Sequence, residues 1–451
     1  MSGALATALR AEIARAREAL ATALGDPAPW TLRGPHERDP LAELSPPLSR
    51  LRAILHEVLG DLDPGAVSTN APDELDALVE IRRAIEGAWV VWDYFRARLA
   101  ARHVERANRY LTFVDDLALA CLADLDGLDA YAVAPICFFH EQPGPEVWPR
   151  GRTVVPPALE PKLRAVFEAV IFELPVALIG LPWSYYGDAS RLTTVCHEAG
   201  HLVYTGLKLA ARVEDALGAC GDEARWRAWA EELFADAWGV LFGAEAYVDA
   251  LTRALIARPI ELVGHAPPSD GEWGGYPSAL SRLRIVGCLH TALGGGPTPL
   301  LESWTEALDG SEGGTAQWVS REQAGEVAAA LLRVDVAGRS LGSRRPAVAD
   351  AIEDVVERLR AQRTLAGGTS AVAVARALAR VPSPPAGIDA VLRYWGNART
   401  PRRISMLTPL GGAEAAGASA PVPEEGVRAF GIARRLRLAV RENQGGQDDG
   451  G

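Results

Sequence analysis

The sequence predicts a mainly α-helical protein with a small β-sheet. Amphipathic helical patterns fill most of the first and last thirds of the chain, whereas strand composition is confined to the stretches 131–139 (YAVAPICFF) and 175–182 (PVALIGLP). The chain has 451 residues, which is too many for one small core. We therefore expect about two or three packing units.

The N-terminal region, 1–125, is expected to be a helical bundle. Residues 3–24 show the spacing of Ala, Leu, Arg and Glu that is typical of an amphipathic helix. A loop rich in proline and glycine follows over 26–47, and further helical patterns run over 48–125. Helices of this kind bury their apolar faces against one another in a bundle.

The middle region, 126–300, is expected to contain the sheet. A strand is predicted over 131–139 and a helical stretch over 160–172. The second strand, 175–182, is bounded by prolines, which predicts a short strand that is either largely buried or at an edge.

Three helices are expected after the second strand. The first covers 189–212, with Asp188 or Ser190 placed to cap its N-terminus. The second begins near Asp222 and the third resumes at Ser278. The rest of the chain is expected to form a helical C-terminal region over 301–410 and a largely flexible tail over 411–451, because the tail is rich in Gly, Ala, Pro, Gln and Asp.

Composition limits the partners and the compartment. The net charge is -12, from 58 acidic against 46 basic residues, which argues against nucleic-acid binding because such binding needs concentrated positive charge. The five cysteines show no CxxC spacing, as expected for reduced thiols in the cytoplasm. The N-terminus lacks a secretory signal, and the most apolar stretch, 165–183, is interrupted by charges and prolines. We expect a cytoplasmic protein without a membrane partner.

The chemistry of the chain is concentrated in the motif His197-Glu198-Ala199-Gly200-His201. Residues four apart lie on one face of a helix, so both imidazoles can bind one cation. Imidazole nitrogen is a good ligand for Zn²⁺. Glu198 lies beside the first histidine and can accept a proton from an attacking water as general base.

The next predicted helix supplies a third ligand, which a catalytic zinc site needs. Glu232 is the candidate, and Asp236 lies four positions later on the same face. Asp236 is expected to accept a hydrogen bond from the non-ligating ring nitrogen of a zinc-binding histidine, which fixes the tautomer of that histidine. Both carboxylates lie among apolar residues, whereas Glu231 fits a solvated acidic face.

The two motifs together, HEAGH and ELFAD, resemble those of the gluzincin group of zinc metallopeptidases. The resemblance covers about 170–290 and implies a zincin-like catalytic core with His197, His201 and Glu232 as zinc ligands. It also implies that Glu198 is the general base and that Asp236 orients a ligand. The strand over 175–182 would be an edge strand that pairs with an extended peptide substrate.

A third segment, YPSALSRLRI from Tyr276, resembles the HisPro…Arg segment of relatives of the CAAX prenyl endopeptidases. Pro277 and Arg282 match that pattern, but Tyr276 stands where the histidine would be. The resemblance implies that Tyr276 and Arg282 lie near the active site, where either can stabilise an oxyanion as a catalytic residue.

These observations predict a zinc-dependent metallopeptidase that hydrolyses a peptide or protein substrate, with a restricted substrate range. Two alternatives stay open. The first is a zinc-binding interaction protein that is catalytically silent or is activated by a regulatory protein partner. The second is a helical structural protein in which the motif is coincidental. Zn²⁺ is the one cofactor that the sequence predicts.

Overall fold

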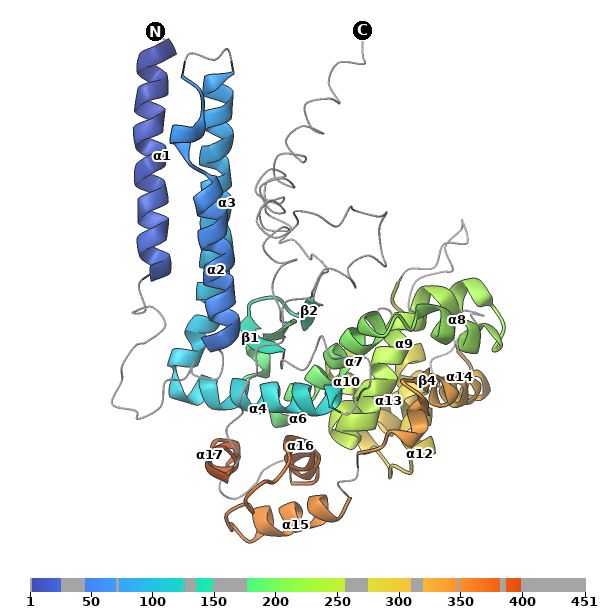
Figure 1. The fold of residues 1–451 in the computed structure, drawn as a ribbon. Coiled ribbons are helices and arrows are strands. Elements are labelled where there is room, and N and C mark those ends of the chain that lie inside the picture. Colours follow the sequence, from blue (N-terminus) through green and yellow to red (C-terminus); the bar gives the residue numbers. More distant parts are fainter. Residues whose placement is uncertain are drawn as a thin grey trace. The chain divides into compact units, whose positions relative to one another are not determined.

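A computed structural model describes residues 2–25, 45–69, 73–123, 125, 135–148, 177–255, 275–309, 319–346, 349–381 and 387–398. These residues form a mainly helical protein with a small sheet, which confirms the predicted fold class at this level (Figure 1). Three expected segments lie outside the described residues: the helix over 160–172, residues 131–134 of the first strand, and the tail over 411–451.

The described elements divide into two compact units. The first contains the helices of Met1–Val104, and the second contains those of Glu105–Pro149 and Ala177–Arg402. From its composition, the sequence is expected to divide into regions near residues 125 and 300. In the structure, the helix that precedes 125 and the helices that follow 300 share one unit with the HExxH helix.

The first unit is built from three helices and two short 3₁₀ turns: α1 (Ser2–Gly25), α2 (Ser45–Asp61), η2 (Pro64–Ala66), α3 (Glu74–Ala100) and η3 (Ala101–His103). Helix α1 packs against α3. On α1 the residues Ala6, Ile13 and Leu20 are buried at seven-residue spacing, and α3 repeats this spacing from Leu78 to Leu99. Such spacing is typical of helices that pack side by side along a narrow apolar seam.

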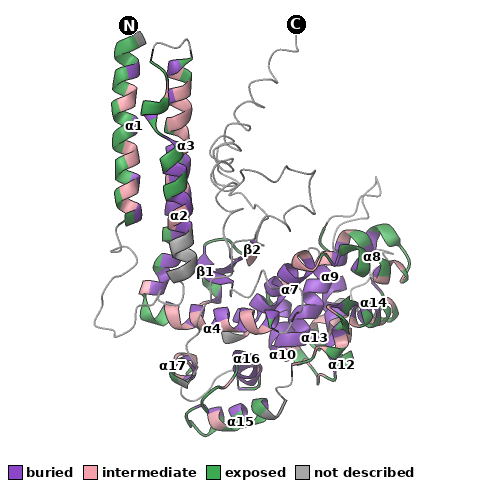
Figure 2. Ribbon diagram, in the orientation of Figure 1, coloured by how far each residue is buried: buried purple, intermediate pink, exposed green. Residues whose placement is uncertain are grey.

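The second unit contains the remaining helices. They are α4 (Glu105–Leu122), α6 (Ala189–Leu192), α7 (Thr194–Gly206), α8 (Ala210–Gly218), α9 (Glu223–Gly243), α10 (Glu245–Leu255), α12 (Ala279–Ala292), α13 (Pro299–Asp309), α14 (Arg321–Arg333), α15 (Ala349–Arg360), α16 (Ala371–Arg380) and α17 (Ile388–Ala398), with η5 (Trp183–Tyr185) and η6 (Leu341–Ser343). Helices α7 and α9 form the buried centre of the unit (Figure 2). Helix α4 packs on α7, whereas α10 and α12 pack on α9.

The main sheet has the strand order β1 (Ile136–His140), β3 (Leu178–Pro182) and β2 (Glu146–Trp148). Strand β3 pairs in parallel with β1 and antiparallel with β2. All five of its residues are buried. The expectation of an edge strand that pairs with substrate is therefore wrong for Leu178–Gly180, because β1 and β2 already pair with its two edges. A second, two-stranded sheet joins β4 (Asp335–Val336) to β5 (Arg339–Ser340).

The helix expected over 189–212 is interrupted twice. Asp188 caps α6 by accepting hydrogen bonds from the backbone N–H groups of Ser190 and Arg191, which confirms it as an N-cap. Helix α7 then ends at Gly206, and Lys208 adopts a left-handed conformation with φ of 52° before α8 begins. A residue other than glycine in this conformation ends a helix, which the helical pattern alone does not show.

Close contact between α7 and α9 depends on Gly200, the glycine of the HExxH motif. A Cβ at this position would lie 2.8 Å from Ala235 Cα and 2.9 Å from Trp238 Cβ. Only glycine lets the backbones of these two helices come so near.

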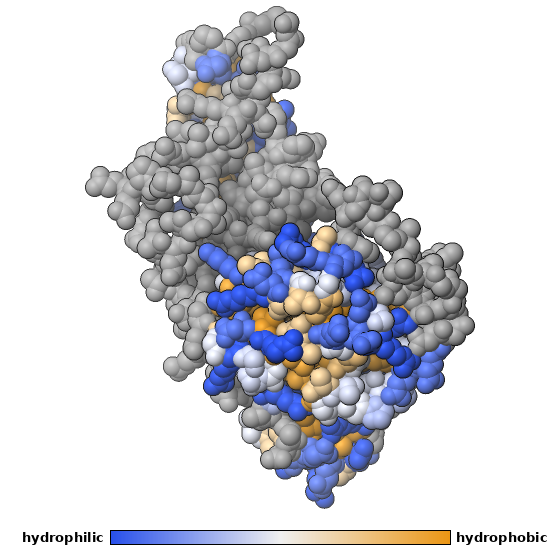
Figure 3. Space-filling view, turned by 90° about the vertical axis from the view of Figure 1, so that its right-hand side faces the viewer, coloured by the Kyte–Doolittle hydropathy of each residue, from blue (hydrophilic) through white to orange (hydrophobic). Residues whose placement is uncertain are grey.

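On the face that Figure 3 shows, the surface of the described residues is largely hydrophilic, with small apolar areas between the hydrophilic residues. Among the described helices, none has an apolar stretch long enough to cross a membrane.

Candidate metal centre

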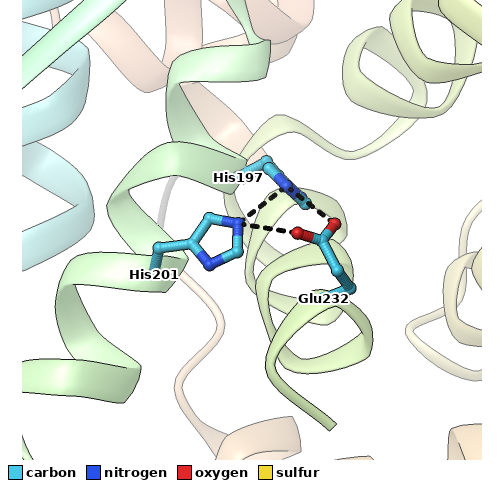
Figure 4. Close-up of side chains that lie close together, drawn as sticks. All are labelled: His197, His201 and Glu232. Atoms are coloured by element: carbon cyan, nitrogen blue, oxygen red, sulfur yellow. Dashed lines mark hydrogen bonds and ion pairs between the residues drawn. The ribbon is translucent and has the colours of Figure 1, made fainter. Parts of the chain in front are cut away.

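Helix α7 presents His197 and His201 on one face, one turn apart. Residues 194–204 of this helix are all buried, so both imidazoles lie inside the protein. Helix α9 runs alongside and presents Glu232, which is buried as well. The three side chains point toward one another, as Figure 4 shows, and their nearest ligand atoms all lie within 4.8 Å of one another.

The spacing of the three side chains fits a metal ion. The Nε2 atoms of His197 and His201 are 3.1 Å apart, and they lie 3.6 and 3.4 Å from the two carboxylate oxygens of Glu232. Ligands at about 2.0 Å from a tetrahedral ion are separated by roughly 3.3 Å. The donor set of two imidazoles and one carboxylate is also one that zinc accepts.

The proton of His197 is fixed by Asp236, which is completely buried. The Asp236 carboxylate accepts two hydrogen bonds from Arg282, at 2.8 and 2.6 Å, and its Oδ1 lies 3.0 Å from His197 Nδ1. An ionised carboxylate can only accept hydrogen bonds, so His197 Nδ1 must carry a proton. The Nε2 atom of His197 then offers a lone pair toward Glu232 and His201.

His201 is oriented in the same way by Glu231, whose Oε1 lies 3.1 Å from its Nδ1. The expectation that Glu231 belongs to a solvated face is therefore wrong in part: its side chain is 39% exposed, yet it contacts the second histidine. Two imidazole lone pairs and a carboxylate thus converge on one point. This arrangement requires a positive charge among them, supplied by a metal ion or by a proton.

The electrostatics of the metal-free site show which group takes that proton. Burial disfavours the imidazolium of His201, but hydrogen bonds with Glu231 and Glu232 outweigh burial and raise its pKa to about 10. Burial also disfavours the charged form of Glu232, but its hydrogen bond with His201 and its interactions with His197 and Arg282 lower its pKa. The metal-free site therefore holds an imidazolium beside an ionised carboxylate.

Glu198 lies within the same buried group. Burial raises the pKa of its carboxyl, and the neighbouring histidines partly oppose this. Among the described residues, His197, His201 and Arg282 favour its charged form. A buried carboxylate is costly unless groups of this kind, a cation or a water lie beside it.

The two remaining predicted residues, Tyr276 and Arg282, differ in their surroundings. Arg282 lies near the start of α12, four residues after the N-cap Ser278. Its guanidinium contacts Asp236 and lies 3.5 Å from Glu232. Burial disfavours its charge, but these carboxylates raise its pKa above the usual range. Tyr276 is 72% exposed, and the negative charge of Glu232 is the main cause that raises its pKa, so its hydroxyl stays protonated. Their role as oxyanion donors stays a prediction.

One residue of this network was not predicted at all. The Tyr247 hydroxyl, from α10, donates a 2.6 Å hydrogen bond to Asp236 Oδ1 and lies 3.1 Å from His197 Nδ1. Its only sequence signal is indirect: Gly239 and Gly243 lie four apart on α9, which indicates a close contact with some neighbouring side chain.

Comparisons with protein-family models, with curated proteins and with solved structures find no match to this chain. What the structure shows is thus a buried group of His197, His201 and Glu232 that can bind a metal ion, in a mainly helical protein with a small sheet.

Proposed function

We propose that this protein is a zinc-dependent metallopeptidase with Glu198 as its general base. The observation that carries the proposal is the convergence of His197, His201 and Glu232 beside the buried carboxyl group of Glu198. A purely structural metal site has no need for a further acid group beside its ligands, whereas hydrolysis requires a base within reach of the attacking water.

The metal and Glu198 have different roles in the proposed hydrolysis. When bound, zinc would supply Lewis acidity, which lowers the pKa of water toward neutral pH and polarises a carbonyl group. Glu198 accepts the proton of the attacking water and returns it to the leaving amine, so no proton is gained or lost over the cycle.

Stabilisation of the tetrahedral oxyanion needs one further donor. Tyr276 fits better than Arg282, because Tyr276 is largely exposed while the guanidinium of Arg282 is held by Asp236. Tyr276→Phe should therefore lower kcat, with little change in metal content. Arg282→Lys should instead disturb Asp236, since a lysine cannot replace two parallel hydrogen bonds.

The variant Glu198→Gln tests the proposal directly. The full-length protein, loaded with zinc, is incubated with a mixture of peptides, and the products are read by mass spectrometry. We expect cleavage by the parent, and a loss of at least about 100-fold in Glu198→Gln with unchanged zinc content. Glu223→Gln, which changes an exposed glutamate at the start of α9, is the matched control and should cleave as the parent does.

Two outcomes would contradict the proposal. Equal cleavage by the parent and by Glu198→Gln would remove Glu198 as the base. A parent that binds zinc but cleaves no peptide would favour the zinc-binding interaction protein.

A further inference from the structure

Tyr247 lies deep in the second unit, although it has no place in the motifs of α7 and α9. It belongs to the first turn of α10, and only 1% of it is exposed. Its ring lies nearly parallel to the His197 imidazole, with an interplanar angle of 13° and 6.1 Å between ring centroids.

Helix α9 provides a slot for this ring. A Cβ at Gly239 would lie 2.6 Å from Tyr247 Cε1 and Cζ, and a Cβ at Gly243 would lie 2.5 Å from Tyr247 Cβ. Real Cβ atoms do not approach other carbons so closely, so any other residue at either position would displace the tyrosine. The ring is therefore held by the backbone of the helix that carries Glu232 and Asp236.

The hydroxyl of Tyr247 joins the hydrogen bonds that set the tautomer of His197. It donates its proton to Asp236 Oδ1 at 2.6 Å, because the ionised carboxylate can only accept. Its oxygen lone pair then lies 3.1 Å from His197 Nδ1, whose proton is shared between this oxygen and Asp236 Oδ1 at 3.0 Å. Two acceptors on one side of the imidazole favour the tautomer in which Nε2 is free.

We infer that Tyr247 is a positioning residue for the metal centre, acting through His197 and Asp236. This inference rests on the metal centre proposed above but not on peptide hydrolysis. Its hydroxyl holds the imidazole in the orientation and tautomer that point Nε2 at the ion. Partners of this kind change metal affinity even though they do not contact the ion.

The test compares Tyr247→Phe with the parent, using the full chain and Co²⁺ as the probe. Phenylalanine keeps the ring in its slot and removes only the hydroxyl. We expect Co²⁺ to bind about tenfold more weakly. We also expect its visible absorption bands to shift, because they report the ligand geometry and do not respond to a general loss of stability.

Tyr110→Phe is the matched control. Tyr110 is also 1% exposed and lies in the same unit, on α4, where it packs against Tyr186. This variant should lose a buried hydroxyl without any change in Co²⁺ affinity or absorption.

Three results would overturn the inference. Equal affinity and equal absorption in Tyr247→Phe and the parent would show that the hydroxyl does not act on the centre. Equal changes in both tyrosine variants would show a general structural effect. Failure of the parent to bind Co²⁺ would remove the metal centre itself, and this result is distinguished from the others because the parent alone shows it.

Discussion

Asp236→Asn is the substitution that most sharply tests the buried network. Asp236 is completely buried, and its carboxylate balances the charge of Arg282, whose side chain is only 10% exposed. The amide keeps the shape of the side chain but leaves the guanidinium without a compensating charge, apart from Glu232 at 3.5 Å. Removing one partner of a buried ion pair costs about 3–5 kcal/mol.

The same substitution should disturb the metal ligand. Asp236 Oδ1 accepts hydrogen bonds from Arg282 and Tyr247 and faces His197 Nδ1, whereas Oδ2 accepts from Arg282 Nε, so the amide oxygen takes the place of Oδ1 and the NH₂ group faces Arg282 Nε. His197 then has a neutral acceptor in place of an ionised one, which weakens the support of its Nδ1 proton and lowers the basicity of Nε2. We therefore expect metal affinity to fall by about 10- to 100-fold, the usual effect of such partners.

Two measurements separate these effects. Denaturant unfolding of the metal-free protein, followed by the fluorescence of its 12 tryptophans, gives the change in the free energy of unfolding. A competition titration with a chelator gives the metal affinity. Asp249→Asn is the matched control, because Asp249 pairs with Arg253 on α10 where both side chains are partly exposed, and it should cost below about 1 kcal/mol. If Asp236→Asn is as stable as this control, the buried ion pair does not have the role assigned to it.

Three further predictions concern the neighbours of the ion. Because the pKa of His201 is raised to about 10, metal binding must displace its proton. Apparent metal affinity should therefore rise about tenfold per pH unit between pH 7 and 9. An affinity that does not depend on pH, measured by chelator competition, would contradict this. Gly200→Ala adds a Cβ where the α9 backbone leaves no room, so the free energy of unfolding should fall by about 1–3 kcal/mol and metal content should fall with it. An unchanged melting temperature would show that the two helices can move apart without a loss of stability. Glu231→Gln removes the charge beside His201 at a partly exposed position, so metal affinity should fall by less than about tenfold, well below the effect at Asp236; titration of both variants side by side makes the comparison.

The parts of this molecule that follow from local geometry could be predicted from the sequence. The spacing of His197 and His201 places them on one helix face whatever surrounds the helix. The helix starts at Asp188, Asp222 and Ser278 are also local, because each of these side chains accepts hydrogen bonds from backbone N–H groups within three residues of it.

Features that depend on distant contacts could not be predicted. The central place of β3 follows from its pairing with β1 and β2, and composition shows that a strand is buried without showing its neighbours. Tyr247 reaches the site only because α10 folds back over two glycines of α9. Glu231 lies at the boundary between the polar and apolar faces of α9, where helical periodicity does not decide which side chain reaches a histidine.

Metal content tests the central claim most directly. The purified chain and its His197→Ala variant are reconstituted with zinc, freed of excess metal and compared by elemental analysis. The convergence of two imidazole lone pairs and one carboxylate predicts about one zinc per chain in the parent and a loss of that zinc in the variant. A parent without zinc after reconstitution, or a variant that keeps it, would contradict the metal centre described here.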